Sequence, residues 1–146
     1  MGNIVPTISS GVAGPLGVIH LPRLWSKLVL GATGKLPESY DSCGHGFDQM
    51  VIDGLGLQRD EVIAFVETKL PSYPEFEAWV KSKGTTLDAA SIEKLNSAIR
   101  GYNHKDATRL AILSASGIPD EGNILDAVSL NNIDDWQELH TQVTSG

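Results

Sequence analysis

Three side chains that could do chemistry lie within one short turn. Cys43, His45 and Asp48 span a Gly-His-Gly turn that leads into a predicted helix starting near Phe47. The first N–H groups of a helix are unpaired, and their partial positive charge favours an anion or a thiolate. This placement would lower the pKa of the Cys43 thiol and raise its nucleophilicity. His45 or Asp48 would then transfer protons, and His20 is an alternative base if the first helix packs across the turn. The alternative interpretation is a tight turn with a helix-start carboxylate and a small packed cysteine.

A second set of side chains is suited to binding an anion. Arg23 and Lys27 lie four residues apart on a predicted helix, and Lys35 lies in the loop after it. Together with the N–H groups of the Gly-rich turn, these cations could converge on a carboxylate or phosphate. The alternative is that they pair with the C-terminal acids, because residues 119–146 contain no Lys or Arg. Those acids are Asp120, Glu121, Asp126, Asp134, Asp135 and Glu138.

Known site motifs are scarce in the sequence. Cys43, His45 and Asp48 are permitted metal ligands, but the paired Cys or His spacings of zinc sites are absent. There is no Gly-x-Ser-x-Gly elbow, P-loop or Gly-x-Gly-x-x-Gly motif. We therefore predict no metal and no cofactor, and we interpret His104 and His140 as ordinary polar residues.

Composition narrows the class of protein. The chain has 146 residues, a net charge of −7 and 41% hydrophobic residues, which indicates a single globular domain. The acidic balance argues against a nucleic-acid surface, and no apolar run approaches the roughly 18 residues of a membrane span. The one cysteine cannot form an internal disulfide and favours a reducing compartment, which predicts a cytoplasmic protein.

Helices must position these side chains. Leu21, Leu24, Trp25 and Leu28 have helical spacing, and Pro22 suits a first helical turn. Further helices are predicted from Phe47 to a stop at 53–56, and over 59–69, 75–83, 87–100 and 106–116, with a short segment over 123–130 and a last one from 131.

No period-two alternation demands a strand, so the fold class is all-α, a compact orthogonal bundle of about six or seven short helices. Residues 1–19 are predicted to form an extended arm on the surface of the domain. Residues 20–140 form a single helical domain and residues 141–146 a frayed tail.

Several stretches resemble the uncharacterised bacterial family catalogued as domain of unknown function 5069. The matching pieces are Leu21-Pro22-Arg23 with Lys27, Gly34-Lys35-Leu36-Pro37-Glu38 with Tyr40, Gly46-Phe47-Asp48, Ala78-Trp79 before Gly84, and Ile124-Leu125-Asp126 ahead of Asp134-Asp135. The resemblance covers most of the chain from about Val18 and implies a small, all-helical, bacterial cytoplasmic protein. It supplies no catalytic assignment and does not include Cys43. Some of the matching residues mark a site or hold the first helix against the turn, and these are Arg23, Lys27, Lys35, Tyr40 and Asp48.

Three functions remain open at this point. We favour a non-enzymatic binding module with an anion-accepting groove between the first helix and the turn at residues 36–48. The alternatives are an enzyme in the same groove, using Asp48 or His45 as acid–base and Cys43 as nucleophile, and an adaptor that docks through its acidic C-terminal segment. The expected partner is a small anionic ligand or a protein, not nucleic acid and not a membrane. Whether the protein is an enzyme, and its oligomeric state, stay open.

Overall fold

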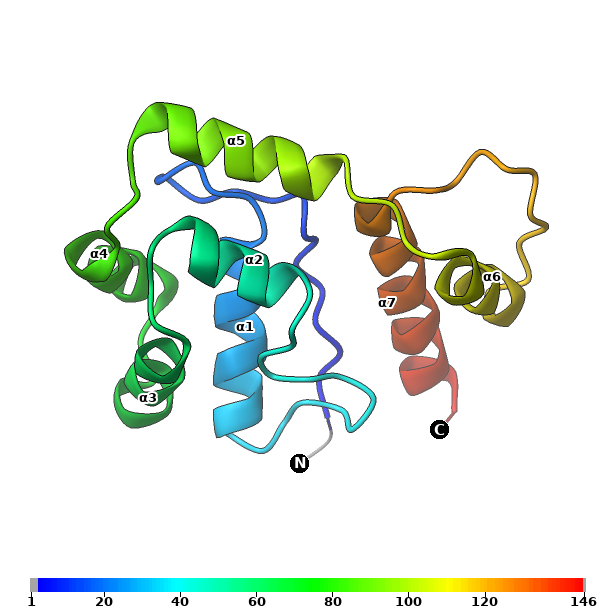
Figure 1. Cartoon of the computed structure of the whole chain (residues 1–146). Helices are drawn as coiled ribbons and strands as arrows, with labels where there is room; N and C mark the ends of the chain where they lie inside the picture. The colour runs from blue at the N-terminus through cyan, green and yellow to red at the C-terminus, as the bar shows by residue number, and fades with distance from the viewer. Residues whose placement is uncertain (1–2, 146) are drawn as a thin grey trace.

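A computed structural model describes residues 3–145, and within them the chain forms seven helices and no strand (Figure 1). This confirms the predicted all-α bundle. Residues 1, 2 and 146, the ends of the predicted arm and tail, lie outside the described part of the chain. The helices are α1 (Leu21–Ala32), α2 (Phe47–Gly54), α3 (Arg59–Lys69), α4 (Tyr73–Lys83), α5 (Ala89–Arg100), α6 (Asp106–Ala115) and α7 (Ala127–Thr144).

Helix α1 lies at the centre of the molecule and contacts α2, α3 and α4. Leu21, Leu24 and Leu28 recur at helical spacing and are buried, as their pattern predicts. Arg23 and Lys27 lie on another face of this helix. Both are buried, because this face is covered by the N-terminal arm, α2 and α7.

The hydrophobic core surrounds α1. Helices α2 to α5 each contribute apolar side chains at helical spacing, and the largest of these are fully buried. They are Val51, Ile52, Val62, Val66, Phe76, Val80 and Ile99, and Leu55 directly after α2 is buried with them. The aromatic rings of Phe65 and Trp79 stack at the edge of this core with their centroids 4.6 Å apart.

Helix α7 differs from its prediction. The two segments expected over 123–130 and from 131 form one helix, which begins after Asp126 and runs past residue 141 to Thr144. The Asp126 carboxylate accepts a hydrogen bond from the Ser129 N–H at 2.9 Å and caps this helix. None of the helices in the described residues is long and apolar enough to cross a membrane.

The N-terminal arm is part of the fold rather than a covering of its surface. Val5, Val18 and Ile19 are buried, whereas Ile4 and Val12 are exposed. The arm runs between α1 and α7 in Figure 1. Its end is held by Asn96 of α5, whose side-chain oxygen accepts a hydrogen bond from the Ile19 N–H at 3.0 Å.

The start of α7 can be tested by removing its cap. The Asp126→Ala substitution should lower the free energy of unfolding by about 1 kcal/mol, because the first turn of α7 loses its hydrogen-bond acceptor. Asn123→Ala is the matched control, since Asn123 is exposed and lies before the helix. Urea denaturation of both variants measures the difference. Equal losses in the two variants would argue for a helix start at 123.

Candidate functional site

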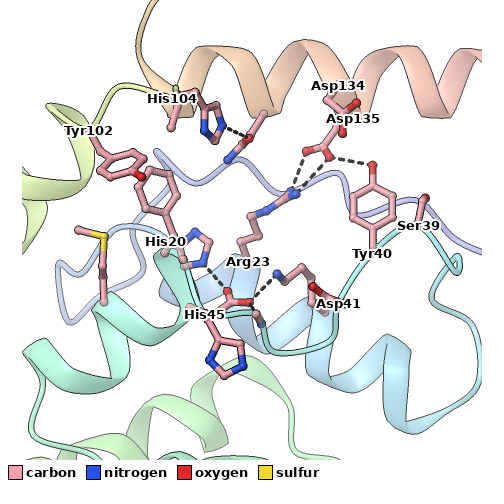
Figure 2. A pocket seen from close by; sticks show the side chains of 18 residues that line it. His20, Arg23, Ser39, Tyr40, Asp41, His45, Tyr102, His104, Asp134 and Asp135 are labelled. Atoms are coloured by element: carbon pink, nitrogen blue, oxygen red, sulfur yellow. Dashed lines mark hydrogen bonds and ion pairs between the residues drawn. The ribbon is translucent and has the colours of Figure 1, made fainter. Parts of the chain in front are cut away.

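A cavity of about 470 Å³ opens between α1, the loop at residues 36–46, α2 and α7, and we call it the α1–α7 pocket (Figure 2). Of the predicted site residues, Arg23, Lys27, Tyr40, His45 and Asp48 all line it. The other side chains that line it are His20, Ser39, Asp41, Phe47, Met50, Tyr102, His104, Ala127, Asn131, Asp134 and Asp135.

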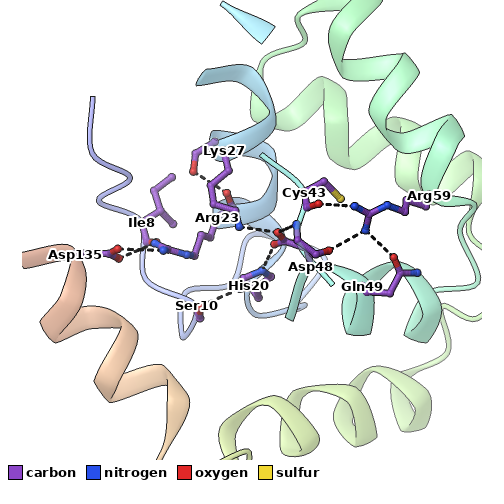
Figure 3. A network of polar contacts seen from close by, with 12 residues as sticks. Ile8, Ser10, His20, Arg23, Lys27, Cys43, Asp48, Gln49, Arg59 and Asp135 are labelled. Atoms are coloured by element: carbon purple, nitrogen blue, oxygen red, sulfur yellow. Dashed lines mark hydrogen bonds and ion pairs between the residues drawn. The ribbon is translucent and has the colours of Figure 1, made fainter. Parts of the chain in front are cut away.

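Asp48, in the first turn of α2, is the hub of a buried polar network (Figure 3). Its Oδ1 lies 2.6 Å from Nε2 of His20, and its Oδ2 accepts from Nζ of Lys27 at 2.6 Å. The Gly44 N–H donates to the same Oδ2 at 2.7 Å. On the far side of the imidazole, Nδ1 of His20 lies 3.0 Å from Oγ of Ser10. One carboxylate therefore joins the start of α1, its second turn and the loop before α2.

Burial determines the protonation of this network. Burial lowers the pKa of His20 below its usual 6.5, although the hydrogen bond to Asp48 opposes the shift, so the ring is neutral at pH 7. Burial would raise the pKa of Asp48, but the hydrogen bond from His20 and the charge of Lys27 lower it to about 2. A neutral ring that faces a carboxylate carries its proton on Nε2, so Nδ1 accepts from the Ser10 hydroxyl. Both imidazole nitrogens are then occupied.

His20 also has an unusual backbone. Its φ is +70°, in the left-handed region, where it precedes the first residue of α1. Such a conformation costs a non-glycine residue on the order of 1 kcal/mol and persists where the surroundings determine it. The contacts of the ring with Ser10 and Asp48 provide that constraint.

Arg23 connects α1 to α7. Its guanidinium donates to both oxygens of Asp135, at 2.7 and 3.1 Å, and to the Ile8 carbonyl at 2.9 Å. The Tyr40 hydroxyl donates to Oδ1 of Asp135 at 2.9 Å. Burial and the nearby Asp135 carboxylate raise the pKa of Tyr40 above its usual range, so the hydroxyl stays a donor.

These contacts change the interpretation of the predicted cations. The alternative that C-terminal acids pair with them holds at Arg23, while Lys27 pairs with Asp48 inside the turn. An anion would have to displace a carboxylate from one of them. Lys35 is not brought to the pocket, because it follows the C-terminal turn of α1, where its carbonyl accepts from Ile4 N–H.

Cys43 does not have the lowered pKa that its position predicts. The thiol is free and half-buried. Burial and the charge of Asp48 raise its pKa, and the cations of Arg59 and Lys27 compensate only in part. The half-buried thiol agrees better with the alternative of a small packed cysteine, because desolvation of the sulfur outweighs the effect of the helix end. A thiolate nucleophile at Cys43 is therefore not supported.

Three of the Asp and His side chains that line the pocket have no hydrogen bond or ion pair within residues 3–145. They are Asp41 and His45, both exposed in the loop, and the half-buried Asp134 of α7. Burial, Asp135 and Glu138 raise the pKa of Asp134. Over the same residues, no group of three His, Cys, Asp or Glu side chains could hold a metal ion.

Aromatic rings line one side of the pocket, where Figure 2 shows Tyr102 and His104 beside His20. Phe47 lies between His20 and Tyr102, with ring centroids at 5.4 and 5.8 Å and edge-to-face geometry. The rings of Tyr102 and His104 are 6.2 Å apart. We call these four residues the aromatic wall. Nε2 of His104 also lies 2.9 Å from Oδ1 of Asn131 on α7.

Sequence reasoning missed several members of the site. It gave no role to Ser10, placed Asn131 only at the start of a helix, treated His104 as an ordinary polar residue, and considered Asp134 only as a partner for the cations or as part of an acidic docking segment. Only α7 carries a signal in the sequence that could have indicated its site residues. The Asp134-Asp135 pair interrupts the helix face that also carries the buried Leu130.

Comparison with known proteins gives one family. The family described as "Domain of unknown function (DUF5069)" matches residues 8–136, a span that contains every residue lining the pocket. No curated protein matches the chain.

The neutral state of His20 predicts a pH-dependent stability. The unfolded chain binds a proton at His20 below about pH 6.5, while the folded chain resists it, because burial lowers the pKa of this residue. The free energy of unfolding should therefore fall as the pH drops from about 7 to about 5, by at most about 1.4 kcal/mol per pH unit for this group. Urea denaturation across this range measures the slope.

His20→Asn should remove most of this slope, because asparagine tolerates the left-handed backbone and does not titrate. His140→Asn, at an exposed site near the end of α7, is the control and should keep the slope. An unchanged slope in His20→Asn would contradict the assignment. Asp48 adds a separate loss only below about pH 4, since its pKa of about 2 lies under its usual 3.8.

Proposed function

The chain belongs to the DUF5069 family, a domain of unknown function, and we propose that it is a non-enzymatic binding module that takes a small polar molecule into the α1–α7 pocket. The observation that carries this proposal is a cavity of about 470 Å³ whose wall contains the buried charges of Arg23, Lys27, Asp48 and Asp135. Ligand sites in proteins are concave, fall in this size range and contain a few fixed polar groups.

The chemistry of the site favours binding over catalysis. The Nδ1 lone pair of His20 accepts from the Ser10 hydroxyl, and Ser10 is buried and does not line the pocket, so this imidazole does not reach the proton of a bound ligand. Asp48 is held ionised by His20 and Lys27, with a pKa of about 2, which suits a structural anion rather than a proton carrier. The raised pKa of the Cys43 thiol argues in the same direction.

The same contacts make the pocket rigid. Arg23 and Lys27 are each held by a carboxylate on another segment, so the wall is ordered before any ligand arrives. A pre-ordered wall reduces the entropy cost of binding. Binding of an anion, which the sequence favoured, remains a possible outcome of the test, at the cost of displacing Asp48 or Asp135.

An enzyme in the same pocket is the second candidate. Two observations favour it: the left-handed backbone of His20, since such strain is frequent at functional sites, and the unpartnered Asp134, whose raised pKa suits proton transfer. In that case His45 or Asp134 would move the proton. Conversion of a bound ligand, followed by NMR over time, would favour this candidate over simple binding.

The adaptor hypothesis has less support. Asp135 is buried against Arg23, Asp134 faces the pocket, and Asp120 pairs with Arg109 at 2.5 Å. Much of the C-terminal acidity is therefore used within the chain. We propose the bacterial cytoplasm as the location, on the basis of the single cysteine and the family resemblance.

The binding proposal is tested by a fragment screen observed through the backbone amides of the labelled protein. Hits should shift the amides of residues 39–48, 102–104 and 131–135, which surround the pocket. They should leave the amides of α3 and α4 unchanged. Hits confined to other surfaces, or no hit in a broad screen, would contradict the proposal.

A blocking variant sharpens this test. Gly46 lines the pocket, has a negative φ, and a Cβ built there meets no atom within 4 Å. Gly46→Phe should therefore occupy part of the cavity and weaken a hit by roughly tenfold or more, a loss of about 1.4 kcal/mol. Gly46→Ala is the matched control, because it makes the same backbone change without the bulk.

A further inference from the structure

We propose that the ligand of the α1–α7 pocket is a small organic cation, an amine in its ammonium form, held between the Asp134 carboxylate and the aromatic wall. This inference rests on the proposed function and names its ligand class. The charge of this ligand is opposite to that of the anion that the positions of Arg23 and Lys27 suggest in the sequence.

The charge of the pocket lining supports a cation. Lys27 is neutralised by Asp48, and Arg23 by Asp135, in contacts of 2.6 and 2.7 Å. The remaining formal charges of the lining are Asp41 and Asp134, both negative and both without an ion-pair partner among residues 3–145. The cavity therefore presents an excess of negative charge at neutral pH, and a bound cation would compensate it.

Asp134 is the carboxylate best placed to take the ammonium group. It is half-buried on α7, and Figure 2 shows it next to Asp135 above the cavity. Burial, Asp135 and Glu138 disfavour its ionised form, and Arg23 and His104 offset this only in part. An ammonium group beside it would relieve the repulsion among the three acids and replace lost hydration with a charged hydrogen bond.

The aromatic wall supplies the second contact. Phe47, Tyr102 and His104 come from α2 and from the segment between α5 and α6, and they lie in an edge-to-face series. Aromatic rings attract organic cations through their faces while they cover the hydrocarbon part of the molecule. A metal cation fits less well, because no three ligating side chains converge within residues 3–145.

The test uses three probes of nearly equal shape: benzylamine, benzyl alcohol and benzoate. Titration of each at neutral pH, observed through the pocket amides, gives three dissociation constants. Benzylamine, protonated under these conditions, should bind at least about tenfold more tightly than benzyl alcohol, because only the cation gains a charged hydrogen bond to Asp134. Benzoate should bind most weakly.

Two variants separate a specific contact from general attraction to an acidic protein. Asp134→Asn should weaken benzylamine by about tenfold or more and leave benzyl alcohol within about twofold. Glu121→Gln removes the same charge from an exposed position outside the pocket and should change neither. Thermal unfolding of both variants confirms that they are folded.

The outcomes distinguish this inference from the proposed function. Tightest binding of benzoate or benzyl alcohol in the pocket would overturn the organic cation and leave the binding module standing. Equal losses in Asp134→Asn and Glu121→Gln would also overturn it, because the attraction would then be non-specific. If none of the three probes shifts the pocket amides, the cation inference is wrong, and the fragment screen alone decides the binding proposal.

Discussion

The structure depends on the compensation of one buried carboxylate. Asp48 lies almost completely out of water, and such a charge is tolerated only when opposite charge and hydrogen bonds surround it. His20 and Lys27 of the α1 region and the Gly44 N–H provide that compensation. The loop before α2 is therefore fixed against α1 by a polar contact, beside a core that is otherwise apolar. The pocket exists because this loop is held there, open on the side that faces α7.

A second buried ion pair, between Arg23 and Asp135, closes the wall of the pocket opposite the loop before α2. Arg23, four residues before Lys27, reaches α7 through Asp135, and Tyr40 joins the same carboxylate from the loop. Helix α1 thus has two buried faces: its leucines pack in the hydrophobic core, and its cations contact Asp48 of α2 and Asp135 of α7. Stability and site are therefore coupled through one helix. A substitution that breaks an ion pair on the face of Arg23 and Lys27 leaves a buried charge without its partner. This unbalanced charge, rather than lost apolar area, is the main cost in free energy of unfolding.

Most of the helices could be predicted, because apolar spacing and helix-ending residues are local signals. The break predicted between Leu130 and Asn131 was wrong, because α7 continues through Asn131, whose side chain contacts His104 instead of starting a new helix. Pairing of Arg23 with a C-terminal acid was one of two alternatives, but its burial and its partner could not be predicted. Its partner Asp135 lies 112 residues further along the chain, and in a single sequence a cation on a helix looks the same whether it faces water or a distant carboxylate. The raised pKa of Cys43 likewise depends on desolvation that only the tertiary structure supplies.

The connection between Arg23 and Asp135 has a consequence for how the protein is made. A chain emerging from the ribosome exposes α1 long before α7, so Arg23 has no counter-ion until the 112 residues that separate it from Asp135 have been synthesised. Until then the Arg23 guanidinium is more stable in water than in the protein interior. The N-terminal arm, which this group binds through the Ile8 carbonyl, is therefore not yet held in place. The apolar core around α1 to α5 can form earlier. The pocket is thus completed only after α7 has emerged.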